Sequence, residues 1–184
     1  MSESVFLSLP KLAQESLARI SFALEGVVPM TVESWPIAVS ALESEAEKEP
    51  LLDTVRNWAS KSKLCLYYFE CISTNVDLAA IERAFADAKA HESNNRAYSR
   101  LNARSTYFYV GSSQSVGKRL ADHLGYGASG TYALQLLHWA RPLSLELQFV
   151  CAKYADTVPY SVVQALEDAL WERRAPMFGR QGRK

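Results

Sequence analysis

The sequence has few cysteines, no net charge and no apolar run of the length that crosses a bilayer. Its 184 residues include only three cysteines, none in a Cys-x-x-Cys pair, and Lys plus Arg equals Asp plus Glu at 20 each. This cysteine usage, in a chain that starts without the basic segment of a secretory signal, predicts reduced and buried thiols rather than disulfides or a zinc site. These absences together predict a cytoplasmic protein without a membrane segment.

A phosphate-binding loop is also missing, although one glycine-rich turn has its outline. Gly111 and Gly117 enclose five residues, whereas a P-loop needs four between its first glycine and the Gly-Lys pair. Lys118 is followed by Arg119 instead of the Ser or Thr that would bind magnesium. The stretch YFYVGSSQSVGKRLADHLG, residues 107–125, therefore requires another explanation.

The charges that are present are unevenly distributed along the chain. Residues 1–60 carry four Lys and Arg against nine Asp and Glu, a net charge of −5, and residues 61–184 carry the compensating +5. A basic segment of this kind can face a polyanion, which the acidic segment would repel. Two separate solvated faces would explain the same charges.

Hydrophobic periodicity predicts a chain that mixes helices with a few strands. Aromatic or alternating runs predict strands over 63–73, 105–111 and 143–152. Helical spacing of apolar residues predicts helices over 10–26, 34–48, 51–60, 77–92, 115–124, 131–140 and 159–175. The expected fold class is α+β, with a small central β-sheet flanked by helices. Residues 1–60 are expected to form an N-terminal helical extension, and residues 61–184 a main domain with a helical insert at about 75–104.

The segment after the second expected strand carries three polar residues in a fixed order. Tyr109 lies in that strand, Arg119 follows ten positions later and His123 four positions after that. Arg119 and His123 therefore share one helix face. Taken singly, a strand tyrosine is usually a core aromatic and an arginine a solvated charge. Their order and spacing together resemble the second motif and first helix of the GIY-YIG nuclease family.

The resemblance extends over residues 65–182, about two-thirds of the chain. CLYYF, residues 65–69, resembles the first motif of the family and aligns Tyr67 with the family tyrosine, with Tyr68 as the alternative. LEDALWERRAPMFGRQG, residues 166–182, is similar to the helix that carries the family's metal-binding glutamate, here Glu167. The family fold is consistent with the predicted α+β class.

The sequence departs from the family in three places. Cys65 stands where the family has a glycine, and Gly179 stands where an asparagine is expected in the turn that begins at Pro176. Tyr67 and Tyr109 are 42 positions apart, whereas the family usually joins these two strands by a tight hairpin. The long link indicates an elaborated member of the family. The missing asparagine is the main support for a second hypothesis, a catalytically degenerate nuclease fold that acts as a nucleic-acid-binding or interaction protein.

The resemblance implies a DNA endonuclease that depends on Mg²⁺. Glu167 would hold one divalent ion, and Arg119 would donate two hydrogen bonds to phosphate oxygens. Tyr67, with Tyr109 or His123 nearby, would orient or deprotonate the attacking water. Only one carboxylate matches the family's metal ligand, which indicates one-metal chemistry. The compact size, without a separate recognition module, favours a restriction or defence-type enzyme.

Six basic residues are candidates for DNA contact. They are Arg96, Arg100, Arg104, Lys118, Arg173 and Arg180. The first three are spaced four apart, so they would share one face if residues 93–104 are helical, and arginines on one face suit phosphate contacts. The alternative is a surface helix whose arginines pair with Asp or Glu. DNA is the expected partner in preference to RNA, and the N-terminal helices are expected to supply a homodimer interface.

Overall fold

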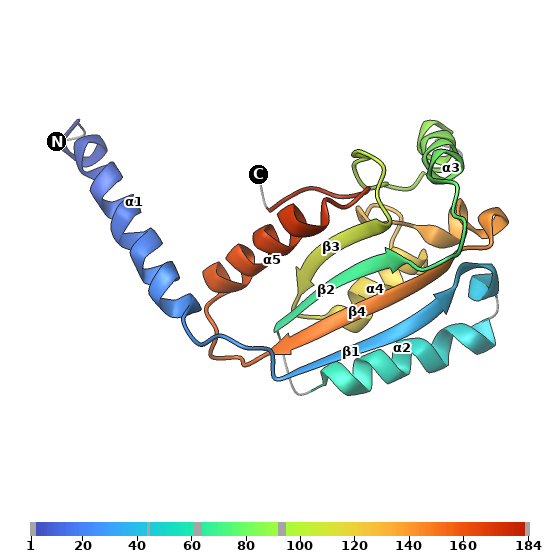
Figure 1. Cartoon of the computed structure of the whole chain (residues 1–184), viewed down its shortest axis with the longest axis horizontal. Helices are drawn as coiled ribbons and strands as arrows, with labels where there is room; N and C mark the ends of the chain where they lie inside the picture. The colour runs from blue at the N-terminus through green and yellow to red at the C-terminus, as the bar shows by residue number, and fades with distance from the viewer. Residues whose placement is uncertain (1–2, 44, 61–63, 92–94, 183–184) are drawn as a thin grey trace.

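The computed structural model describes residues 3–43, 45–60, 64–91 and 95–182, and its centre is a four-stranded antiparallel sheet (Figure 1). In spatial order the strands are β1 (Thr31–Ala38), β4 (Glu146–Tyr154), β2 (Leu64–Cys71) and β3 (Tyr107–Ser113). Each neighbouring pair runs antiparallel. The predicted α+β class with a small central sheet is confirmed.

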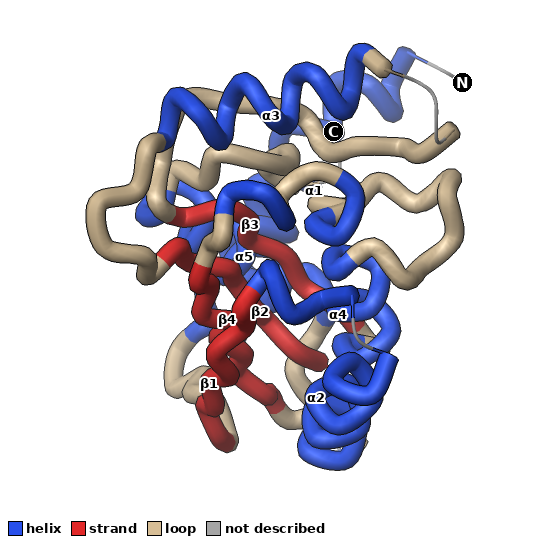
Figure 2. Tube along the Cα trace, turned by 90° about the vertical axis from the view of Figure 1, so that its right-hand side faces the viewer, coloured by secondary structure: helices blue, strands red, loops and turns tan. Residues whose placement is uncertain are grey.

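Helices cover both faces of this sheet. The α-helices are α1 (Glu3–Leu24), α2 (Glu45–Ala59), α3 (Leu78–Ala90), α4 (Val116–Leu124) and α5 (Tyr160–Arg174), and short 3-10 turns include η1 (Val39–Glu43), η3 (Leu136–His138) and η4 (Arg141–Leu143). α5 packs against β3 and β2, and α2 packs against α4 (Figure 2). The C-terminal end of α1 contacts α5, and the rest of α1 extends away from the sheet (Figure 1). No helix within the described ranges is long and apolar enough to span a bilayer.

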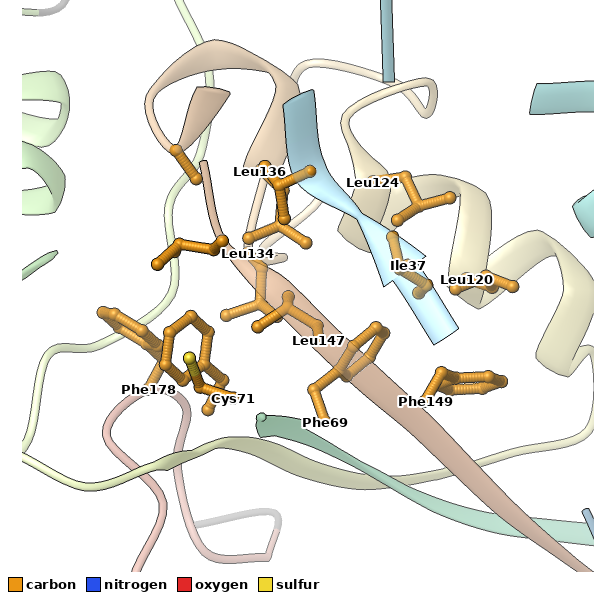
Figure 3. Packing of buried hydrophobic residues seen from close by; sticks show 14 of the residues in the cluster. Ile37, Phe69, Cys71, Leu120, Leu124, Leu134, Leu136, Leu147, Phe149 and Phe178 are labelled. Atoms are coloured by element: carbon orange, nitrogen blue, oxygen red, sulfur yellow. The ribbon is translucent and has the colours of Figure 1, made fainter. Parts of the chain in front are cut away.

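Alternation along β2 divides its side chains between two hydrophobic clusters. Tyr67 and Phe69 face the larger cluster, whereas Leu64 and Leu66 face the smaller one beneath α5. Figure 3 shows Phe69 of β2 among side chains from β1, β4 and α4, including the fully buried Phe149. Burying one side chain of this size stabilises a fold by about 1.5–3 kcal/mol, so this cluster fixes the sheet beneath α4.

The prediction of one helix in the N-terminal extension is wrong. The helix expected over 34–48 is replaced by the second half of β1, by η1 and by the start of α2. β1 pairs with β4 from Thr31 to Ala38, so an edge strand of the sheet lies within the first sixty residues, which were expected to be helical. Pro36 is compatible with this strand, because proline lacks a backbone N–H and the outer side of an edge strand needs no N–H donor for a neighbouring strand. Pro50 does not end a helix either, because it lies inside α2. The division into two units at residue 60 stays a prediction.

The insert is helical only in its first half. The helix expected over 77–92 is confirmed as α3, with the Asp77 carboxylate accepting hydrogen bonds from its first turn. Residues 95–104 are not helical, because their backbone groups bond to distant segments instead. Ser99 N–H donates to Ala133 O at 3.1 Å, and Asn102 N–H donates to Met177 O at 2.8 Å. Arg96, Arg100 and Arg104 therefore do not share a helix face; residues 93 and 94 lie outside the described ranges.

A third expected helix is mostly absent. Residues 131–140 contain only the short turn η3. Gln135, just before that turn, takes a left-handed backbone conformation with φ +57°, which a continuous helix does not allow. The residues before it instead line up beside residues 97–99, with a parallel bridge between Tyr98 and Ala133. This pairing brings the 129–133 loop next to the candidate site.

Candidate functional site

The structure brings four of the five predicted catalytic side chains into one hydrogen-bonded group. Arg119 Nε donates to the Tyr67 hydroxyl at 3.3 Å, and Arg119 Nη2 donates to the Tyr109 hydroxyl at 3.2 Å. The Tyr67 hydroxyl also lies 3.1 Å from His123 Nε2. β2 and β3 supply the tyrosines and α4 supplies the other two residues, so three elements converge on the guanidinium.

The adjacency of β2 and β3 makes this convergence possible. Despite the 42 positions between them, the strands are direct neighbours, and Tyr67 stands opposite Gly111. The rings of Tyr67 and Tyr109 are nearly parallel, with 9° between their planes and 6.3 Å between centroids. α4 continues from β3 after a tight turn and ends at Gly125, which takes φ +105°. Arg119 and His123 thus lie on the side of α4 that faces the two tyrosines.

Strand alternation distinguishes Tyr67 from its alternative, Tyr68. Tyr68 points to the opposite face of the sheet, where its ring meets Tyr107 and lies 5.1 Å from the guanidinium carbon of Arg174. Only Tyr67 reaches Arg119 and His123. Tyr67, and not Tyr68, therefore lies beside Arg119.

His123 is fully buried, and both of its ring nitrogens are engaged. The backbone N–H of Leu134 donates to Nδ1 at 3.2 Å, so Nδ1 carries the lone pair. Burial and the nearby Arg119 cation hold the pKa of His123 well below its usual range, so the ring is neutral and its proton is on Nε2. Nε2–H therefore donates to the Tyr67 oxygen, which also accepts from Arg119.

Glu167 approaches the same place from the other face of the sheet. It lies on α5, is half-buried, and accepts a hydrogen bond of 2.5 Å from the Ser112 hydroxyl at Oε2. Burial raises the pKa of Glu167, and the hydrogen bond from Ser112 partly opposes that shift. Because β3 is the last strand in the sheet order, the two faces meet along its outer edge.

That edge opens into a cavity of about 980 Å³, lined by Tyr109, Arg119 and Glu167 among others. No family model, curated protein or solved structure matches this chain. Within the described ranges, no cluster of three or more His, Cys, Asp or Glu side chains could hold a metal.

Two glycines flank the ring of Tyr109, and sequence reasoning assigned neither a role in placing it. A Cβ on Gly111 would lie 2.8 Å from the Tyr67 hydroxyl and 3.0 Å from Tyr109 Cε1. A Cβ on Gly179 would lie 2.8 Å from Tyr109 Cε2, and Gly179 has φ +103°. The asparagine expected at position 179 would therefore collide with Tyr109 unless the ring moved. The observed position of the Tyr109 ring therefore requires a glycine at position 179.

Asn102 holds the turn that carries Gly179. Its side-chain amide donates to Pro176 O at 3.0 Å and to Gly179 O at 3.1 Å. Gly179 N–H in turn donates to Arg100 O at 2.8 Å. The inserted segment therefore fastens the end of α5 against the site. No local sequence pattern indicates this role, because residues 102 and 179 are far apart in the sequence.

The six candidate DNA-binding residues separate into two groups. Arg96, Arg100 and Arg180 line the cavity, together with Lys89, which sequence reasoning missed. The Arg96 guanidinium also donates to Gly127 O and to Gln135 Oε1, so part of its donor capacity is used within the fold.

The remaining candidates lie elsewhere. Arg104 Nε donates to Glu82 Oε2 at 2.5 Å. The alternative of pairing with an acidic residue is thus confirmed for Arg104, although its segment is not a helix. Lys118 and Arg173 are exposed on α4 and α5 and are not among the residues that line the cavity. Cys65, the other departure from the family, is buried in the core.

Proposed function

We propose that this protein is a Mg²⁺-dependent DNA endonuclease that hydrolyses phosphodiester bonds with one metal ion. The observation that supports the proposal most is that Arg119, Tyr109 and Glu167 line one cavity, which Arg100 and Arg180 make strongly basic. A cavity with a hydrogen-bonded cation, one carboxylate and several phosphate-binding side chains suits a phosphodiester and its charged transition state. The order of residues that resembles the GIY-YIG family agrees with this chemistry.

Arg119 is the phosphate-binding group of the proposed site. Its guanidinium is held from several sides, because Nη2 also donates to the backbone oxygen of Tyr132 at 2.8 Å, and Nη1 lies 3.7 Å from Asp122 Oδ2. Although burial opposes its charge, the oxygens of Tyr67 and Tyr109 raise its pKa, and the group stays cationic. A cation fixed in advance stabilises developing negative charge without reorganisation in the transition state.

The two tyrosines have different roles in the proposed site. Tyr109 lines the cavity and accepts a hydrogen bond from Arg119, so its own O–H can donate to the attacking water or to a phosphate oxygen. Tyr67 is only 2% exposed, and two donors, Arg119 and His123, face its oxygen. In this arrangement Tyr67 and the neutral His123 fix Arg119, and His123 is not the direct base for water.

Glu167 has the surroundings that a hydrated magnesium ion requires. Ser112 bonds to Oε2, which leaves Oε1 as a ligand beside a cavity large enough for the water molecules that Mg²⁺ retains. When bound, the ion neutralises charge on the phosphate and lowers the pKa of a bound water. Glu167 supplies one ligand, and the phosphate and water would supply the rest.

One observation favours a second candidate, a nuclease fold that binds nucleic acid without cutting it. The resemblance implies that Tyr67 or a neighbour deprotonates the attacking water, but burial raises the pKa of Tyr67, and both Tyr67 and His123 are buried away from the cavity. This candidate keeps the basic cavity and lacks only the cleavage activity.

The primary proposal also includes a restriction or defence role, a cytoplasmic location and a homodimer formed through the N-terminal helices.

Nicking of supercoiled plasmid DNA separates the two candidates. We expect Mg²⁺-dependent conversion to open circles, loss of cutting in EDTA, and loss in Glu167→Gln, whose amide is a poor ligand of the same shape. Glu172→Gln on the same helix is the control, because Glu172 bonds to Gln181 and does not line the cavity. A protein that binds DNA but does not cut it supports the second candidate. Faster cutting of an RNA strand of the same sequence would show that RNA, and not DNA, is the substrate.

A further inference from the structure

Tyr132 is an exposed aromatic side chain at the cavity that holds Arg119 and Glu167. Its side chain is 69% exposed and is among those that line this cavity. Within the described part of the chain this side chain makes no hydrogen bond or ring contact, in contrast to Tyr67 and Tyr109. An unpartnered ring of this size in a basic cavity leaves apolar surface in water that a ligand could bury.

The backbone of Tyr132 is fixed, although its ring is free. Its carbonyl accepts the 2.8 Å hydrogen bond from Arg119. The next residue, Ala133, accepts from Ser99 N–H, and Leu134 N–H donates to His123. The point at which this side chain is attached is therefore defined, and it lies beside the proposed phosphate-binding group. An exposed aromatic face next to cationic side chains is the combination that binds unpaired nucleic-acid strands.

We propose that Tyr132 stacks on a nucleobase next to the scissile phosphate, and that the substrate presents this base outside a paired helix. The inference rests on the proposed nuclease function and specifies its substrate. In duplex DNA both faces of a base are covered by its neighbours in the stack, so a tyrosine can stack only on a base that is unpaired or extruded. The class of substrate is thus DNA with a single-stranded or locally opened nucleotide at the cut.

The test compares binding of a 5′-labelled DNA single strand with binding of its fully paired duplex, both in EDTA to prevent cutting. Tyr132→Ala should weaken single-strand binding by roughly 5- to 150-fold, the range for one stacked base, and should leave duplex binding unchanged. Tyr132→Phe should bind the single strand like the unchanged protein, because the ring is retained. The backbone carbonyl that Arg119 contacts remains in both variants, so the site is not dismantled.

Tyr160→Ala provides the matched control, because Tyr160 is 50% exposed at the start of α5 and is not among the residues that line the cavity. It should bind both probes like the unchanged protein. Equal single-strand binding by Tyr132→Ala and the unchanged protein overturns the stacking inference alone. Equal weakening of single strand and duplex overturns it as well and makes Tyr132 a general contact. If the unchanged protein binds neither probe, the proposed function itself fails.

Discussion

The hydroxyl of Tyr67 lies 3.1 Å from Nε2 of the buried His123, and the histidine is the donor. This direction follows because Leu134 N–H occupies Nδ1 and the ring is neutral. The Tyr67 oxygen therefore receives hydrogen bonds from His123 and Arg119 at once. Removal of this one oxygen would leave a buried histidine N–H without an acceptor and would release Arg119 on one side.

Tyr67→Phe should reduce the single-turnover cleavage rate by a factor on the order of ten or more, because Arg119 loses a positioning partner. It should also lower the free energy of unfolding by about 1–3 kcal/mol, because a buried donor is left unsatisfied. Tyr68→Phe is the matched control on the adjacent residue, which faces away from Arg119 and packs against Tyr107. Its rate should be unchanged. Equal rates in the two variants would remove Tyr67 from the site.

Ser112→Ala should move the acid limb of the pH–rate profile to higher pH. The pKa of Glu167 is raised by burial, and the Ser112 hydrogen bond lowers it in part, so removing that bond raises the pKa further. Metal binding needs the carboxylate, so cleavage is present above this pKa and is lost as the pH falls through it. Mg²⁺ titrations at several pH values provide the measurement. Ser113→Ala is the control, since the Ser113 hydroxyl bonds to Ser115 N–H instead; coincident profiles would contradict the prediction.

Arg100→Ala and Arg180→Ala should each weaken DNA binding and lower the slope of log affinity against log salt by about 0.9 for each phosphate that the variant no longer neutralises. Both residues line the cavity. Arg104→Ala should leave the slope unchanged, because Arg104 is engaged by Glu82. Binding is measured by fluorescence anisotropy over a series of salt concentrations. A slope that falls only in Arg104→Ala would move the DNA away from the cavity.

The predicted homodimer depends on the exposed apolar side chains of α1. Phe6, Leu9 and Leu17 recur at helical spacing on one side of the helix and are 70%, 45% and 66% exposed. If they form the interface, Phe6→Glu combined with Leu17→Glu should convert a dimer to a monomer in light scattering. Glu15→Gln, on the opposite side of α1, should remain a dimer. A monomeric unchanged protein at the same concentration would show that the prediction is wrong.

Local patterns predicted those parts of the fold that local chemistry determines. The aromatic run of β2 and the amphipathic repeat of α4 gave the correct elements, and the spacing of Arg119 and His123 placed them on one face. β1 was missed because its strand conformation depends on pairing with β4, more than a hundred residues later. Residues 95–104 were missed for the same reason, since their hydrogen bonds run to residues 133 and 177.

The candidate site divides in a similar way. The five side chains with recognisable chemistry were predicted and lie close together, because their types and order carry the signal. The residues that position them carry none: Asn102 acts through a turn near the C-terminal end, and Gly179 acts by having no side chain near Tyr109. Ser112 had a weak signal, since it immediately follows Gly111 in the YVGS motif.

The pairing of β1 with β4 has a practical consequence for any shortened form of the protein. A truncation at residue 60 would remove β1 and expose the side of β4 that pairs with it along residues 146–153, although β2 would still pair with the other side. An open strand edge of this length is a template for pairing with other chains, so the shortened protein should aggregate even with every proposed catalytic residue present. The acidic N-terminal segment is thus a cover for the sheet, and a shortened protein that stays dispersed has to begin before residue 31.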